Sequence, residues 1–146
     1  MIRFQVIDVM MPTLDFDRVR AWILTVVAQE GYQIGELYYY FCSDEALLDI
    51  NQRRLGHDFY TDIVTFPLAE ESLISSEFCI SVERIDENSL IFGRTIESEL
   101  LRVIIHGVLH LIGYDDHTDS EQAEMRSKEE ECLNIYYNKL NINKIE

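Results

Sequence analysis

The sequence predicts an α+β fold in which helices pack on a small mixed sheet of about four strands. Short segments rich in β-branched and aromatic residues alternate along the chain with longer segments whose apolar residues recur at helical spacing. The length of 146 residues and the hydrophobic content of 47% suit one core and are too small for two ordinary domains. We find no internal repeat, low-complexity segment or linker. We therefore expect one domain over residues 1–146, with residues 141–146 as a frayed tail.

The N-terminal part is predicted to contain a strand, a helix and a second strand. Residues 2–7 have the composition of a strand. The apolar residues of segment 14–30 recur at helical spacing, and Gly31 can end that helix in the left-handed conformation. Residues 36–42 are rich in tyrosine and phenylalanine, which favours a strand. Alternation along it buries some tyrosines and exposes others, so packing explains this run better than stacking on nucleic-acid bases.

The middle of the chain is predicted to contain a helix and two strands. Ser43 is suited to cap a helix over residues 44–55 that stops at Gly56. Pro67 places the end of the following strand at a sheet edge or terminus, because proline cannot donate to the ladder. The two strands are expected at residues 63–66 and 78–82. The polar stretch between them, residues 70–77, is expected to be a loop or hairpin arm.

The C-terminal part is predicted to be helical. A short helix is expected over residues 83–90, and a longer one from about Thr95 onward. Residues 118–121, Thr-Asp-Ser-Glu, have the form of a capping box and start a last helix that reaches about Leu140.

Three of the four histidines lie in one twelve-residue segment, 106–117, which comprises the end of the longer helix and the turn that follows it. His106 and His110 leave one helix face about one turn apart, within reach of a single ion. Gly113 ends the helix and turns the chain back, so that either Asp116 or His117 can approach the same point. Such a pair can also be two core histidines, but burying imidazoles without partners costs free energy. Three ligands with an open fourth position are typical of catalytic zinc in a zincin-like site.

The spacing resembles that of metzincin peptidases, His-Glu-x-x-His-x-x-Gly-x-x-His, but one position differs. His106, His110 and Gly113 hold the metzincin offsets, and Asp116 holds the third-ligand offset. Gly107 stands where the peptidases have their general base. The metal scaffold is therefore present, whereas a peptidase of that type would lack its base.

Two blocks of the chain resemble the YbeY endoribonucleases, which are rRNA maturation factors. Residues 101–115 closely resemble the stretch of that family that carries its His-Gly-x-Leu-His-Leu-x-Gly-Tyr-Asp-His signature. Residues 48–51 and 61–67 resemble its Leu-Asn and Thr-Asp-Val-Leu-Ser-Phe-Pro stretches at the expected separation. The resemblance covers about residues 44–125. It implies one YbeY-like metallohydrolase domain with one Zn²⁺ ion, acting as a single-strand-specific endoribonuclease in 16S rRNA 3′-end maturation and ribosome quality control.

Two departures from the family pattern affect the expected site. The family's third histidine aligns with Asp116, and His117 follows it. We favour Asp116 as the ligand because of its offset, and keep His117 as the alternative. A family arginine thought to contact the substrate aligns with Leu55. Arg54 and Arg53 lie just before it and are the candidates for phosphate contacts, although cations at a helix C-terminus also suit the helix dipole.

The formal net charge of −15 argues against a generic nucleic-acid binder, because phosphates are held mainly by lysine and arginine. Acidic residues crowd the last helix, which we expect to face solvent away from the site: Asp119, Glu121, Glu124, Glu129, Glu130 and Glu131. RNA binding is then expected to be weak, magnesium-dependent or partner-assisted. The resemblance implies single-stranded RNA or rRNA, small-subunit components or an assembly GTPase as partners, and neither DNA nor a membrane.

Cysteine usage and hydropathy suggest a cytoplasmic protein. Cys42, Cys79 and Cys132 form an odd, scattered set, which fits reduced thiols, and the first two lie in apolar strand-like runs where burial is expected. No run of about 18 apolar residues occurs, and the first residues lack the features of a secretory signal.

In the expected mechanism, the nucleophile that attacks the phosphodiester is either a zinc-bound hydroxide or a ribose 2′-hydroxyl. Arg54 or Arg53 stabilises the charge that develops on the phosphate. Glu99, two turns before His106, either orients a ligand or is a surface carboxylate. No residue is identified as the general base. Two alternatives stay open: a non-catalytic ribosome-assembly factor with a structural metal, and a metal-dependent hydrolase of another substrate.

Overall fold

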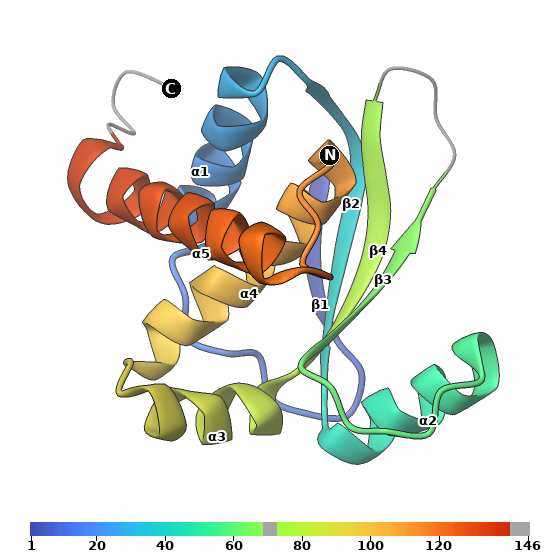
Figure 1. Ribbon diagram of the computed structural model, residues 1–146. Helices are drawn as coiled ribbons and strands as arrows, with labels where there is room; N and C mark the ends of the chain where they lie inside the picture. The colour runs from blue at the N-terminus through green and yellow to red at the C-terminus, as the bar shows by residue number, and fades with distance from the viewer. Residues whose placement is uncertain (69–72, 141–146) are drawn as a thin grey trace.

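A four-stranded mixed sheet forms the centre of the computed structural model, which describes residues 1–68 and 73–140 (Figure 1). The strand order is β1-β2-β4-β3. Strands β1, β2 and β4 are parallel, and β3 runs antiparallel to β4 at the edge. The strands are β1 (Ile2–Val6), β2 (Gln33–Cys42), β3 (Ile63–Pro67) and β4 (Leu73–Ser81). The predicted α+β class and small mixed sheet are confirmed.

Five α-helices surround this sheet within the described residues. They are α1 (Phe16–Gln29), α2 (Asp44–Leu55), α3 (Val82–Phe92), α4 (Ile96–Ile112) and α5 (Asp119–Asn134), and a π-helical turn, η1 (Ile135–Lys139), follows the last. Helix α2 has the bounds expected from Ser43 and Gly56: the Ser43 side chain accepts from the Ala46 N–H, and Gly56 has φ +67°. The final helix starts at its capping box, but its α-helical part ends at Asn134 rather than near Leu140.

The main core lies between one face of the sheet and helices α1, α4 and α5. Trp22 of α1 is fully buried there, and its Nε1 donates to the Cys132 carbonyl of α5 at 2.7 Å. Tyr39 of β2 is buried in the same core, whereas its neighbours Tyr38 and Tyr40 are half-buried, as the predicted alternation requires. Helix α4 belongs to the same core, where its Ile104 carbonyl accepts a hydrogen bond from the Tyr39 hydroxyl at 3.3 Å.

Helix α2 packs on the opposite face of the sheet from α4 (Figure 1). Its Leu47 forms a small separate cluster with Cys42, Val64 and Cys79. This division decides which side chains can meet: residues of α4 and α5 share one side of the sheet, and residues of α2 lie on the other.

The polar stretch predicted as a loop over residues 70–77 is largely strand. Strand β4 begins at Leu73, because β2 extends back to Gln33 and pairs with it in parallel. This part of β4 contains Ser75 and Ser76, whose polar composition is typical of a loop. Both serines are nevertheless buried in the sheet. Residues 70–72 of the predicted loop and the predicted frayed tail, residues 141–146, lie outside the described residues. No helix in the described ranges is long and apolar enough to cross a membrane.

The three cysteines are free and buried, so we expect them to be unreactive in the native protein. Burial raises the pKa of Cys42 to about 12, that of Cys79 to about 11 and that of Cys132 to about 12. The thiolate, which is the reactive form, is therefore scarce at pH 8. A chromogenic thiol reagent should titrate no cysteine at pH 8 until denaturant is added, and all of them afterwards. Rapid reaction of the folded protein would contradict this.

Candidate metal centre

Helix α4 carries the candidate ligands, and both of its ends are defined by local sequence. Thr95 caps its N-terminus, where its side chain accepts from the Ser98 N–H. Gly113 ends it with φ +119°, and its N–H donates to the carbonyls of Leu109 and His110 at 3.1 Å each. The left-handed conformation at Gly113 reverses the chain, as predicted. The residues that follow therefore pass back over the end of α4 toward its histidine face.

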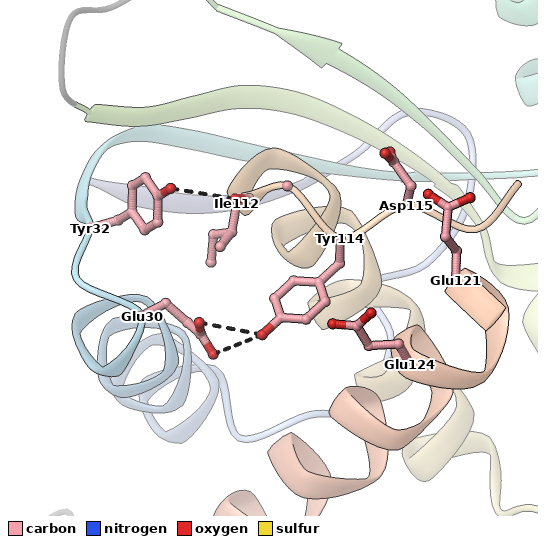
Figure 2. A pocket seen from close by; sticks show the side chains of 8 residues that line it. Glu30, Tyr32, Ile112, Tyr114, Asp115, Glu121 and Glu124 are labelled. Atoms are coloured by element: carbon pink, nitrogen blue, oxygen red, sulfur yellow. Dashed lines mark hydrogen bonds between the residues drawn. The ribbon is translucent and has the colours of Figure 1, made fainter. Parts of the chain in front are cut away.

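The first residues after Gly113 line an acidic hollow of about 380 Å³ between α1 and α5 (Figure 2). The Tyr114 hydroxyl lies 3.4 Å from both carboxylate oxygens of Glu30, and burial raises its pKa. Four carboxylates line this hollow: Glu30, Asp115, Glu121 and Glu124. Such a surface repels a phosphodiester, so this hollow is not suited to bind RNA.

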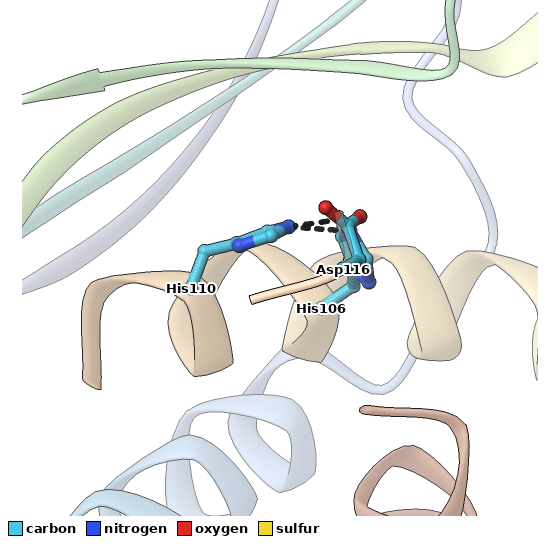
Figure 3. Close-up of side chains that lie close together, drawn as sticks. All are labelled: His106, His110 and Asp116. Carbon is cyan, nitrogen blue, oxygen red and sulfur yellow. Dashed lines mark hydrogen bonds and ion pairs between the residues drawn. The ribbon is translucent and has the colours of Figure 1, made fainter. Parts of the chain in front are cut away.

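Asp116 turns to the other side and meets the two histidines of α4 (Figure 3). The Nε2 atoms of His106 and His110 lie 3.0 Å apart. Asp116 Oδ2 lies 3.3 Å from the His110 Nε2 and 3.7 Å from the His106 Nε2. The three side chains are half-buried, and one atom from each can face a common point.

These distances fit a tetrahedral metal ion. Ligand atoms about 2.0–2.1 Å from zinc at tetrahedral angles are separated by about 3.3 Å, close to the three distances seen here. Two imidazole nitrogens and one carboxylate oxygen are a common donor set for a catalytic ion, and the fourth position would stay open for water or substrate. His117 is exposed and belongs to no such group among the described residues. The geometry therefore favours Asp116 over His117.

Glu129 of α5 holds His106 in place. The Nδ1–H of His106 donates to Glu129 Oε2 at 2.5 Å, which leaves Nε2 available for an ion. We expected Glu129 to face solvent with the other acidic residues of this helix, and that expectation is wrong. Glu129 is only 3% exposed because α5 packs directly on α4. A sequence signal existed: Glu129 shares a helical stripe with Met125 and Cys132, which are also buried.

A half-buried arginine of α4, Arg102, links Glu129 to Glu99 near the start of the same helix. Arg102 donates to both carboxylate oxygens of Glu99, at 2.9 and 2.7 Å, and to Glu129 Oε1 at 3.2 Å. Burial alone would lower the pKa of Arg102, but these carboxylates and Asp62 raise it, so its charge is retained. Glu99 is fully buried and supports Arg102, so it is neither a surface carboxylate nor a direct partner of a histidine. Glu99 is therefore connected to the ligand His106 only through Arg102 and Glu129.

Gly107 lets α4 approach the sheet beside the ligands. A Cβ atom at this position would lie 2.6 Å from Cε1 of Phe78 and 3.0 Å from Cδ1 of Ile63. The glutamate that metzincins have here therefore could not be accommodated without separating α4 from the sheet. The absence of a glutamate at position 107 agrees with this close packing, and it tells against metzincin-type peptidase chemistry at this site.

The structure does not bring Arg53 and Arg54 to the histidine site. Arg53 pairs with Asp49 at 2.9 Å on its own helix. The Arg54 guanidinium lies over the Phe66 ring, 3.9 Å from its centroid. Both belong to α2, on the opposite face of the sheet, and neither lines the hollow that contains His106. Their contact with substrate stays a prediction.

Replacing Glu129 by glutamine should weaken metal binding without unfolding the protein. The glutamine keeps the size of the side chain but removes the charge that orients His106, and we expect about a 10- to 100-fold loss of affinity for Zn²⁺. Competition with a chromogenic chelator measures it. Glu124→Gln, an exposed change on the same helix, is the matched control. Equal affinities in both variants would show that Glu129 does not position the ligand.

Comparisons with known proteins give a consistent result. The family model described as Endoribonuclease YbeY matches residues 7–137. Endoribonuclease YbeY of Cytophaga hutchinsonii is 44% identical over 118 residues, which cover 80% of this chain and 82% of that protein. Its counterpart in Bacteroides thetaiotaomicron is 39% identical over 132 residues, covering 90% and 96%. The solution structure of TM1509 from Thermotoga maritima matches with a TM-score of 0.62 at 30% identity, covering 94% of this chain and 89% of that one.

Proposed function

Since the chain belongs to the YbeY family of endoribonucleases, we propose that it is a zinc-dependent enzyme that cuts single-stranded RNA. Its relatives are named endoribonucleases, which indicates RNA as the substrate class and a phosphodiester as the bond that is cleaved. We further propose that it processes rRNA, maturing the 3′ end of 16S rRNA and serving ribosome quality control. It would do so as one domain in the cytoplasm, with small-subunit components or an assembly GTPase as partners.

One observation carries the proposal: the convergence of His106, His110 and Asp116. Three donor atoms 3.0–3.7 Å apart match the ligands of a catalytic zinc site with one open position. The carboxylate of Glu129 behind His106 completes the histidine–carboxylate pair that usually accompanies such a ligand.

A bound zinc ion would supply a Lewis acid and lower the pKa of a coordinated water towards about 7. The chain's own residues orient the ligands of this ion. Glu129 retains the Nδ1 proton of His106, so that this imidazole presents Nε2 to the site. Arg102 lines the same hollow of about 220 Å³, and its ion pairs with Glu99 and Glu129 hold the Glu129 carboxylate behind His106.

Arg53 and Arg54 are proposed as additional phosphate contacts only because they directly precede Leu55, where the resemblance places the family's arginine. Because they lie on the other face of the sheet, the RNA strand would have to pass around the edge strand β3 to reach both them and the histidines.

The test is cleavage of an end-labelled single-stranded RNA by protein loaded with one equivalent of zinc. We expect cleavage of the single strand, little cleavage of the same sequence as a duplex, and none with His110→Ala purified in parallel. Intact RNA despite stoichiometric zinc would overturn the proposal, and equal cleavage by His110→Ala would reveal a contaminating nuclease.

A further inference from the structure

A groove leads away from the candidate ligands along α5. Its first part, about 220 Å³, is lined by His106 and Asp116 together with Arg102 and Arg126. Its second part, about 440 Å³, shares Arg102 and Arg126 and ends at Phe92. Since the two parts have side chains in common, they adjoin, and together they have the size of a site for a small ligand or one nucleotide unit.

Arg126 is the cation of this groove whose charge is available. Arg102 is neutralised by Glu99 and Glu129, and Arg94 is paired with Glu130. The side chain of Arg126 is exposed and forms no ion pair with any residue in the described parts of the chain. In a chain of net charge −15, an unpaired guanidinium beside the candidate ligands is a specific place for an anion.

Phe92 provides an aromatic surface at the far end of the groove. It is the last residue of α3 and is 62% exposed, although a phenylalanine is usually buried. Gly93, with φ +65°, ends the helix directly after it. Phe92 therefore lines the groove at a helix end, where a nucleobase can stack on its exposed ring.

We propose that this groove binds the RNA strand next to the cleaved phosphodiester, with Arg126 holding a neighbouring phosphate and Phe92 stacking on an unpaired base. The inference rests on the proposed function and extends it to the substrate-binding residues. It also gives a physical reason for single-strand preference: a base inside a duplex is stacked and paired, so its face is not free for Phe92.

The test measures binding of a fluorescent 2′-O-methyl single-stranded RNA to the zinc-loaded protein, with intactness of the RNA checked on a gel. For Arg126→Gln we expect weaker binding and a salt dependence, log K against log [salt], that is less steep by about 0.7. For Phe92→Ala we expect about tenfold weaker binding with an unchanged slope. Both variants should keep the zinc content and melting temperature of the unaltered protein.

Matched controls separate these effects from general changes in charge and surface. Arg3→Gln removes the same charge from β1, at the sheet edge opposite β3, and Ile91→Ala trims an exposed apolar neighbour of Phe92. Both controls should bind RNA like the unaltered protein. If Arg126→Gln and Phe92→Ala behave like their controls while the unaltered protein cuts RNA, the proposal that this groove binds RNA is wrong and the proposed function stands. If the unaltered protein neither binds nor cuts single-stranded RNA, the proposed function itself fails.

Discussion

Asp116→Ala should lose both tight zinc binding and RNA cleavage, whereas His117→Ala should keep both. Asp116 supplies one of three donor atoms, 3.3 and 3.7 Å from the two histidine nitrogens, while His117 is exposed outside the group. Loss of a direct ligand should exceed the 10- to 100-fold effect typical of residues behind the ligands, so we expect zinc affinity to fall by about 100-fold or more. Competition with a chelator gives the affinity, and labelled RNA gives the activity.

A third variant makes this comparison sharper. Asp116→His introduces the residue that the family signature has at this position, and an imidazole is an equally competent ligand. It should therefore bind zinc while Asp116→Ala does not. If instead His117→Ala loses zinc and Asp116→Ala retains it, the turn after Gly113 places the histidine at the ion, and the arrangement described here is wrong.

Gly107→Ala should destabilise the protein, although alanine is the better helix former. In a helix interior this exchange normally stabilises by about 1 kcal/mol. Here the added Cβ would lie 2.6 Å from Cε1 of Phe78, whose ring is fully buried and stacked on Tyr39. Overpacking of this kind costs about 1–3 kcal/mol. We therefore expect a melting temperature a few degrees lower, measured by circular dichroism.

The larger change Gly107→Glu should be more damaging, because it places a charged side chain against the apolar side chains of Phe78 and Ile63. It would place a glutamate at the metzincin offset yet yield an unstable protein, not a peptidase. A Gly107→Ala protein that melts higher than the unaltered one would mean that Phe78 and Ile63 yield freely and that close helix–sheet contact is not required.

Features fixed by short-range interactions could be predicted from the sequence. The cap at Ser43, the left-handed glycines at Gly56 and Gly113, and the capping box that begins at Thr118 were all identified correctly, because each depends on residues within one helical turn. The start of β4 was not, because residues 73–77 are strand only through pairing with β2, some forty residues away in the chain. Propensity carries no information on such a partner.

The same distinction applies to the site. His106, His110 and Asp116 share one helix and its following turn, so their convergence was visible in local sequence. The role of Glu129 depends on the packing of α5 on α4, and helical spacing predicts the burial of Glu129 but not its partner on α4. The two acidic residues that follow it, Glu130 and Glu131, made it resemble part of a solvated face. Its burial beside Met125 and Cys132 shows that the apolar stripe was the better guide.

The most direct test of the metal centre is a crystal structure of the zinc-loaded protein with anomalous diffraction recorded on both sides of the zinc absorption edge. We expect one anomalous peak about 2.0–2.2 Å from Nε2 of His106, Nε2 of His110 and a carboxylate oxygen of Asp116, with a fourth position free of protein ligands. A peak bound by His117, or one in the acidic hollow beside Glu30, would contradict the account.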